Sequence, residues 1–231
     1  MTTDAEFVPS WVYSMADYCQ MFDLSESDLE FAILDYPAGI SSFNAEMFQQ
    51  GYKVHSGDPN YNMSLVELTS FSKTILDKNV EHLKAHEEIL RDSTALDRIV
   101  SDWEESRTTF LKDYEQGKFE SRYQMMMLPR LPFDDQQFDI ALCSDHLFHN
   151  HTAHKCQQEG VITELCRVAK EVRVFPLMNE QGDIAESLGQ VMLECQQKGY
   201  AIEIKQVAFH QLKGGNAMLR IWATTCAVEN A

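Results

Sequence analysis

The residues best suited to chemistry lie in the first third of the chain, where a glycine turn and an acid each follow a strand-like run. Residues 33–35 are Ile-Leu-Asp, and they lead through Tyr-Pro-Ala into Gly39. Residues 53–57 form a second run, and Asp58 comes directly after it, 19 residues beyond Gly39. In nucleotide-binding βαβ units an acid about 20 residues past the glycine loop reaches a ribose hydroxyl. The spacing therefore favours a nucleotide-binding role for Gly39 and Asp58.

The local pattern around Gly39 predicts a strand, a sharp turn and a helix. Glycine suits a turn in which the backbone takes a positive φ or lies against a ligand. Ser41 and Ser42 precede apolar residues at helical spacing (Phe43, Met47 and Phe48), so a serine is a candidate N-cap. The first turn of such a helix offers N–H groups to a carboxylate or phosphate.

The remainder of the chain alternates between strand and helix patterns. Strands are predicted over 123–128, 140–144 and 172–177, and helices over 161–169 and 184–198. Two last strands, 201–209 and 217–225, flank Lys-Gly-Gly-Asn at 213–216, which is a hairpin signal. This order predicts an α/β fold: a doubly wound, mostly parallel, seven-stranded sheet with the first strand central and an antiparallel C-terminal hairpin.

The alternation is interrupted once, between residues 61 and 122. Apolar residues recur at helical spacing from Leu65 to Leu83 and again from Leu96 to Tyr114, which is far more than one short crossover helix requires. We therefore expect one domain over residues 1–231, with a helical insertion at 61–122 and an N-terminal helical extension at 1–31. The insertion leaves the sheet directly after Asp58, so we expect it to pack beside the ligand cleft.

Composition excludes several classes of function. The chain has 231 residues, 44% of them hydrophobic, and a formal net charge of −17, which disfavours binding to nucleic acid or to an anionic membrane. Its six cysteines form no CxxC pair, which is typical of reduced thiols. The N-terminus carries acids where a signal peptide is basic, and no apolar run reaches membrane-spanning length. We expect a cytoplasmic protein.

Five segments in order resemble the class I S-adenosylmethionine-dependent methyltransferases, and together they cover nearly all of the chain. They are ILDYPAGISSF, SGDPNY, LPFDDQQFDIALCSDHLFH, ITELCRVAKEVRVF and the closing run GYAIEIKQVAFHQLKGGNAMLRIWAT. The resemblance implies a Rossmann-like methyltransferase fold, with S-adenosylmethionine as the cofactor and methyl donor. The acceptor that it implies is a small molecule or a protein side chain, with no nucleic acid and no membrane as partner. The oligomeric state stays open.

The resemblance also implies which residues bind the donor. Asp58 would accept hydrogen bonds from the ribose hydroxyls, and Asp35 would orient the loop or meet the ammonium group of the donor. Two features depart from the family pattern: Gly39 is the one glycine in its loop, and no acid stands near Leu128 to meet the adenine amino group. Backbone groups and apolar faces would then hold the adenine. The implied cofactor-binding residues are Asp35, Pro37, Ala38, Gly39, Ser41, Phe43, Asp58, Pro59, Leu128 and Ser144.

Asp145 and His146 follow the fourth predicted strand and are the candidate catalytic residues. A histidine there could act as general base for an oxygen or nitrogen acceptor. Four histidines and a cysteine between residues 146 and 156 could ligate zinc. However, His146 and His149 share a helical face that His151 does not, and no carboxylate motif accompanies them. We therefore predict no metal, and a solvated histidine-rich loop is the plainer interpretation.

Two other classes of function compete with the methyltransferase. One is a non-catalytic binding or scaffold protein on the same fold, which the single-glycine loop and the missing adenine acid favour. The other is a nicotinamide-dependent oxidoreductase. It is disfavoured because residues 38–43, Ala-Gly-Ile-Ser-Ser-Phe, lack the G-x-G-x-x-G that lets a backbone approach pyrophosphate.

Overall fold

The computed structural model describes residues 12–145, 147–148, 155–179 and 182–223, and its sheet is built around the short strand β1 (Ile33–Asp35). All residues of β1 are buried. The strand pairs in parallel with β2 (Val54–Asp58) on one side and with β4 (Phe138–Ser144) on the other. A parallel strand between two neighbours is covered on both faces, which explains its apolar sequence. The first strand, predicted to be central, lies inside the sheet and parallel to the second strand, next to β4 at the middle of the seven.

The sheet has seven strands in the order β3-β2-β1-β4-β5-β7-β6. The others are β3 (Tyr123–Met125), β5 (Ala169–Phe175), β6 (Tyr200–Gln206) and β7 (Ala217–Ala223). Strand β7 runs antiparallel to both β5 and β6, and the other pairs are parallel. The predicted Rossmann-like fold, with its mostly parallel sheet and antiparallel C-terminal hairpin, is confirmed.

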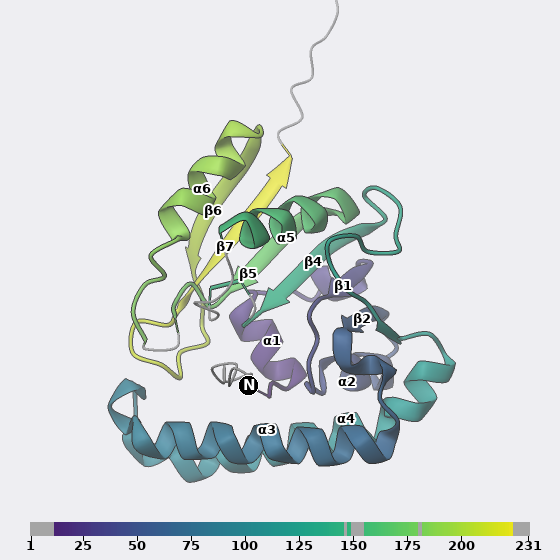
Figure 1. The fold of residues 1–231 in the computed structure, drawn as a ribbon, viewed down its shortest axis with the longest axis vertical. Helices are drawn as coiled ribbons and strands as arrows, with labels where there is room; N and C mark the ends of the chain where they lie inside the picture. The colour runs from purple at the N-terminus through teal and green to yellow at the C-terminus, as the bar shows by residue number, and fades with distance from the viewer. Residues whose placement is uncertain (1–11, 146, 149–154, 180–181, 224–231) are drawn as a thin grey trace, which may run out of the picture.

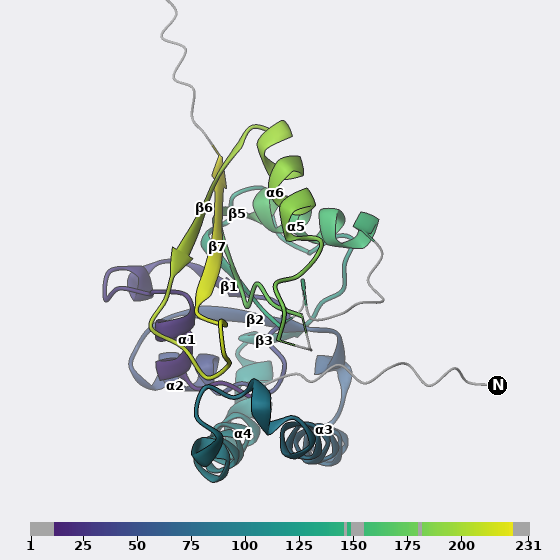
Figure 2. The ribbon, with the colours of Figure 1, turned by 90° about the vertical axis from the view of Figure 1, so that its left-hand side faces the viewer.

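Helices cover both faces of the sheet (Figure 2). Helices α1 (Met15–Met21) and α2 (Phe43–Gln49) lie on one face, and α5 (Lys155–Val168) and α6 (Leu188–Gln197) lie on the other. Successive side chains of a strand point to opposite faces. Accordingly, Ile33 belongs to the apolar core on the α1–α2 side, and Leu34 belongs to the core on the α5–α6 side.

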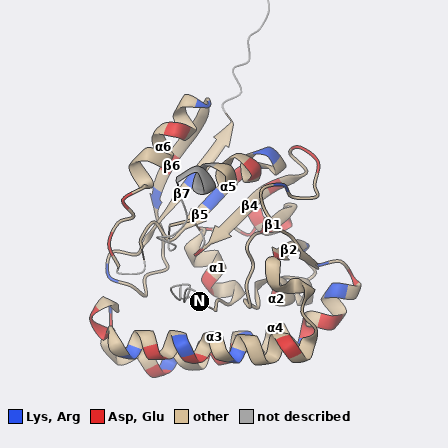
Figure 3. Cartoon of the chain, viewed as in Figure 1, with Lys and Arg blue, Asp and Glu red and all other residues tan. Residues whose placement is uncertain are grey.

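Two long helices, α3 (Leu65–Ala85) and α4 (Leu96–Phe119), are inserted between β2 and β3. A capping box starts α3: the hydroxyl of Ser64 accepts a bond from the N–H of Glu67, whose side chain accepts one from the N–H of Ser64. The two helices lie side by side across the side of the molecule toward which β4 points (Figure 1). Acidic and basic side chains alternate along them (Figure 3), as expected for a solvated face.

The connection between α3 and α4 reaches the connection between β6 and β7, and we call this the tip contact. Leu90 and Leu212 form an isolated antiparallel bridge. The N–H of Arg91 donates to the carbonyl of Gln211, and the N–H of Lys213 donates to the carbonyl of Ile89, each at 2.9 Å. Only 1% of Leu90 is exposed. The insertion therefore spans from the end of β2 to the hairpin and is fastened there.

Several predicted boundaries differ from the structure. Strand β3 ends at Met125, β6 ends at Gln206, and α5 begins at Lys155. Strand β5 covers 169–175. It ends before Pro176, which has no N–H with which to extend the ladder. The expected N-cap bond of Ser42 is not made, since its hydroxyl donates to the carboxylate of Glu46. Within the described residues, every helix is too short or too polar to cross a membrane.

Candidate functional site

The carboxyl ends of β1, β2 and β4 meet at one edge of the sheet. Because the strands are parallel, Asp35, Asp58 and Ser144 all lie at that edge, where open α/β sheets bind ligands. The turn from β1 to α2 runs over the same edge, and the N–H of Ala38 donates to the carbonyl of Gly57 at 2.9 Å. The structure thus brings together the acids and the glycine turn that the sequence separates.

Gly39 and Asp58 are in direct contact. Gly39 has a φ of +58°, in the left-handed region that favours glycine. Its N–H donates to Oδ2 of Asp58 at 3.0 Å, and the N–H of Asn60 donates to Oδ1 at 2.8 Å. The hydroxyl of Tyr61 donates to the carbonyl of Gly39 at 2.8 Å. The acid at the end of β2 therefore holds the turn after β1 in place.

Asp58 is 5% exposed, and burial raises the pKa of its carboxyl group, while the two N–H bonds act in the opposite direction. Each carboxylate oxygen can accept about two hydrogen bonds. One bond to each oxygen comes from the backbone, so the carboxylate keeps acceptor capacity for hydroxyl groups of a ligand. Pro59, next in the chain, is exposed at the start of a short 3-10 helix.

Asp35 lies deeper than Asp58, with 1% of it exposed. The hydroxyl of Tyr18 donates to its Oδ1 at 3.1 Å, and that of Ser56 donates to its Oδ2 at 3.3 Å. Burial raises the pKa of Asp35 to about 7; those two bonds lower it, and the charge of Asp58 adds to the rise. Asp35 thus meets side-chain hydroxyls of α1 and β2.

The N-terminal helix α1 lies over this group. The ring of Tyr18 stacks on the ring of Phe43 with centroids 4.2 Å apart, and both residues are fully buried. The N–H of Tyr13 donates to the hydroxyl of Ser41 at 3.2 Å, and the N–H of Ser42 donates to the carbonyl of Tyr13 at 3.0 Å. The capping pair Ser14 and Asp17 marks the start of the helix that carries Tyr18, but no local pattern in the sequence predicts the hydroxyl contacts of these tyrosines.

The end of β4 joins the same network. The hydroxyl of Tyr18 gives its one hydrogen to Asp35, so Ser144, whose Oγ lies 3.4 Å away, is the donor in the Tyr18–Ser144 pair. Asp145 has a φ of +52°, and its N–H donates to the carbonyl of Phe175 at 2.9 Å. The hydroxyl of Tyr13 donates to Oδ1 of Asp145 at 3.1 Å.

The remaining predicted site residues have less contact with this edge. Pro37 and Leu128 are half-buried, and Leu128 packs against the core on the α5–α6 side. His146 and residues 149–154 of the histidine-rich segment lie outside the described residues. Among the residues that are described, no group of three or more histidine, cysteine or acidic side chains is arranged to hold a metal ion.

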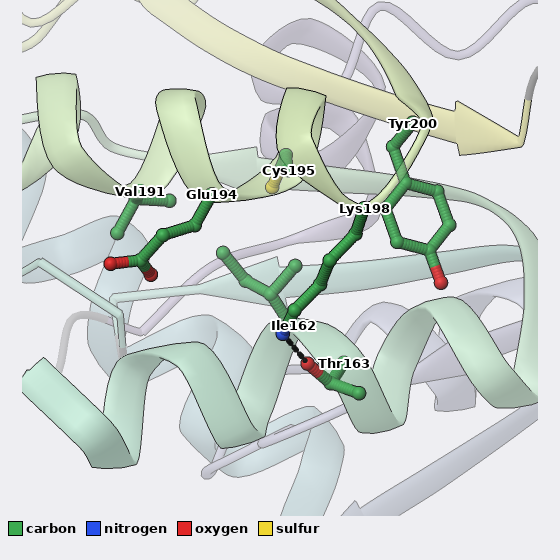
Figure 4. A pocket seen from close by; sticks show the side chains of 7 residues that line it. All are labelled: Ile162, Thr163, Val191, Glu194, Cys195, Lys198 and Tyr200. Atoms are coloured by element: carbon green, nitrogen blue, oxygen red, sulfur yellow. Dashed lines mark hydrogen bonds between the residues drawn. The ribbon is translucent and has the colours of Figure 1, made fainter.

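A cavity opens at the carboxyl ends of β4 and β5. It is lined by Tyr13, Asp145, Phe175, Pro176, Phe209, Leu212 and Gly215. The last three belong to the β6–β7 connection, which the tip contact joins to the insertion. A second cavity lies between α5 and α6, where Nζ of Lys198 donates to the hydroxyl of Thr163 at 2.9 Å (Figure 4). Tyr200, which lines this second cavity, is the first residue of β6, the last strand in the sheet order.

Comparisons with known proteins identify a relative by sequence and several similar folds. No protein-family model matches the chain. A Methanocaldococcus jannaschii protein described as "Uncharacterized protein MJ0045" is 30% identical over 213 residues, which span 89% of this chain and 91% of that protein.

Several solved structures of low identity that resemble this fold are described as methyltransferases. Magnesium protoporphyrin IX methyltransferase from Synechocystis, with SAH bound, is 10% identical, with a TM-score of 0.45 over 84% of this chain and 74% of that one. A SAM-dependent methyltransferase from Aquifex aeolicus is 16% identical, with a TM-score of 0.43 over 90% and 92% of the two chains. At this level of similarity no residue role is transferred from them.

Proposed function

The chain belongs to the protein family of MJ0045, and we propose that it is an S-adenosylmethionine-dependent methyltransferase whose acceptor is a small molecule or a protein side chain. The observation that carries the proposal is the contact between Gly39 and Asp58 at the carboxyl edge of the sheet. A turn that needs a glycine and an acid that ends the next strand are the two parts with which such a sheet holds a nucleoside. The methyltransferase resemblance of five segments along the chain supports the same reading.

In this proposal, the residues of the carboxyl edge bind the donor. Asp58 accepts bonds from the ribose hydroxyls with the acceptor capacity that the backbone leaves, and the turn 37–42 passes beside the amino-acid end of the donor. S-adenosylmethionine supplies a methyl group already activated on sulfur. The protein then has mainly to hold donor and acceptor in line, because correct alignment alone supplies a large share of the acceleration.

One observation favours the scaffold alternative. The polar groups of the turn are bonded to each other: Asp58 to Gly39, and Tyr61 to Gly39. Asp35 is buried and accepts a hydrogen bond from Tyr18, whose ring stacks on that of Phe43. A fold that has lost its donor would need such internal partners for its buried polar groups. The two proposals therefore differ in whether the turn opens for a ligand.

Titration calorimetry with S-adenosylmethionine, S-adenosylhomocysteine and NAD, each added to the same preparation, tests the proposal. We expect both adenosyl compounds to bind and to raise the thermal midpoint, since a ligand that binds only the native state stabilises it. NAD should do neither. If neither adenosyl compound has an effect at millimolar concentration, the scaffold alternative remains. Binding without transfer of a radiolabelled methyl group to acceptors in a cell extract would also favour that alternative.

A further inference from the structure

We propose that the cavity at the carboxyl ends of β4 and β5 binds the amino group of a small amine, which in the proposed function is the methyl acceptor. The methyl-transfer step of this inference rests on the proposed function, whereas the binding of the amine does not. Its grounds are the aromatic walls of the cavity, the charge of the one acid in it, the size of its enclosed part and its place beside the donor turn.

Three aromatic rings wall the cavity. Those of Tyr13 and Phe209 meet edge to face with centroids 5.7 Å apart, and those of Phe175 and Phe209 do so at 5.6 Å. All three residues are at most 5% exposed, so the rings are fixed by packing. The face of an aromatic ring carries partial negative charge and attracts a desolvated cation. Fixed aromatic rings that line a small space are therefore compatible with an ammonium group.

Among the described residues that line the cavity, Asp145 is the one carboxylate, and none is a lysine or an arginine. The bond from the hydroxyl of Tyr13 orients the carboxylate, and the bond from its own N–H to Phe175 holds the backbone. Burial raises the pKa of Tyr13 well above its ordinary value, and the negative charges of Asp145 and Asp17 raise it further. The carboxylate of Asp145 thus gives the described part of the lining a negative charge, which suits a cation better than a carboxylate or phosphate ligand.

The size of the cavity matches one small polar group. The cavity has a volume of about 10 Å³. An enclosed volume of roughly 10–15 Å³ holds one water molecule. An ammonium group is of similar size, so it fits against Asp145, which lines the cavity, with the rest of the amine outside the enclosed space.

The cavity adjoins the donor turn. Tyr13 bonds to both serines of that turn through its backbone, and Ser144, which precedes Asp145, reaches the group around Asp35. In the reaction, the ammonium group gives one proton to the carboxylate of Asp145. The freed nitrogen lone pair forms the new N–C bond, the S–C bond breaks, and its electron pair stays on sulfur. Asp145 then releases the proton to water.

To test the site, the protein is saturated with S-adenosylhomocysteine and then titrated calorimetrically with three matched probes. The probes are 2-phenylethylamine, 2-phenylethanol and 3-phenylpropionate. We expect the amine to bind about tenfold or more tightly than the alcohol, as for a bond to a charged rather than a neutral partner, and the acid not to bind. In Asp145→Asn the preference for the amine should disappear. Asparagine tolerates a left-handed φ, so this variant keeps the backbone.

Asp134→Asn is the matched control, because Asp134 is an exposed acid near the start of β4, at the other end of the strand. It removes the same charge and should leave the preference unchanged. Failure of the amine to bind, equal affinity for amine and alcohol, or an unchanged preference in Asp145→Asn would each overturn the proposal. Failure of this proposal can be distinguished from failure of the donor site. Titrating the amine without S-adenosylhomocysteine shows whether the amine still binds when the donor does not.

Discussion

The N–H of Gly39 donates a hydrogen bond of 3.0 Å to Oδ2 of Asp58, and this bond joins the turn after β1 to the end of β2, together with the bond from the N–H of Ala38 to the carbonyl of Gly57. Asp58 therefore has a structural role in holding the turn, in addition to its proposed role toward a ribose. The consequence is that substitutions here change both stability and ligand affinity, and a useful experiment must measure the two separately.

Asp58→Ala should lower the affinity for S-adenosylhomocysteine at least tenfold. It removes charge-assisted hydrogen bonds worth about 1.5–3 kcal/mol each, and about 1.4 kcal/mol corresponds to a factor of ten. It also leaves the N–H groups of Gly39 and Asn60 without their acceptor, so the thermal midpoint should fall. Calorimetry well below that midpoint separates the two effects. An unchanged affinity in the folded variant would contradict the donor site.

Gly39→Val should destabilise the protein by about 1–2 kcal/mol or more, because a left-handed φ is costly for a residue with a Cβ and more so for a β-branched one. The φ of Gly39 is +58°. Gly189→Ala is the matched control: Gly189 lies in α6, and an added Cβ meets nothing within 4 Å. Urea denaturation should show a neutral or stabilising effect for the control, since glycine in a helix is less favourable than alanine by roughly 0.5–1 kcal/mol.

Asp35 should make stability depend on pH. The pKa of its carboxyl group is raised by burial to about 7 in the folded state, against 3.8 ordinarily. Between these values the folded state binds more protons than the unfolded state, so the free energy of unfolding falls as pH rises from about 4 to 7.

Asp35→Asn cannot titrate and should lose less stability than the wild type between pH 5 and pH 8. The difference is at most a few kcal/mol, since one pKa unit is worth about 1.4 kcal/mol. Urea denaturation of both proteins across the range measures it. Parallel pH profiles would show that Asp35 does not titrate in this window.

Leu90→Asp should release the tip contact between the insertion and the hairpin. Leu90 is 1% exposed, and a buried unpaired carboxylate is strongly unfavourable. Hydrogen exchange at the N–H groups of Arg91 and Lys213 should then become faster, while exchange within β4 and β5 stays slow. Val66→Asp, at a position of α3 that is 80% exposed, is the control and should change neither. Unchanged exchange at Arg91 would mean that the contact does not depend on Leu90.

The order of elements follows from the sequence alone. Ile33 and Leu34 are apolar on both sides of one short run, which predicts a strand buried on both faces, and the 19-residue spacing of Gly39 and Asp58 indicates that they share an edge. Capping residues such as Ser64 and Glu67 act within one turn, so the start of α3 is also readable locally. These features depend on neighbours a few residues away, or on a period along the chain.

Only the tertiary structure decided which partners the polar side chains of the candidate site contact. Tyr13 lies 132 residues from Asp145, and Tyr18 lies 126 residues from Ser144, yet their hydroxyl groups meet. No local pattern encodes such a pairing, because it depends on how α1 packs across the ends of β1 and β4. The same packing buries Asp35 and raises its pKa, and it closes the aromatic cavity around Asp145. The sequence by itself thus determined the sheet and the place of a site at its edge, whereas long-range packing determined which side chains form that site and how they are charged.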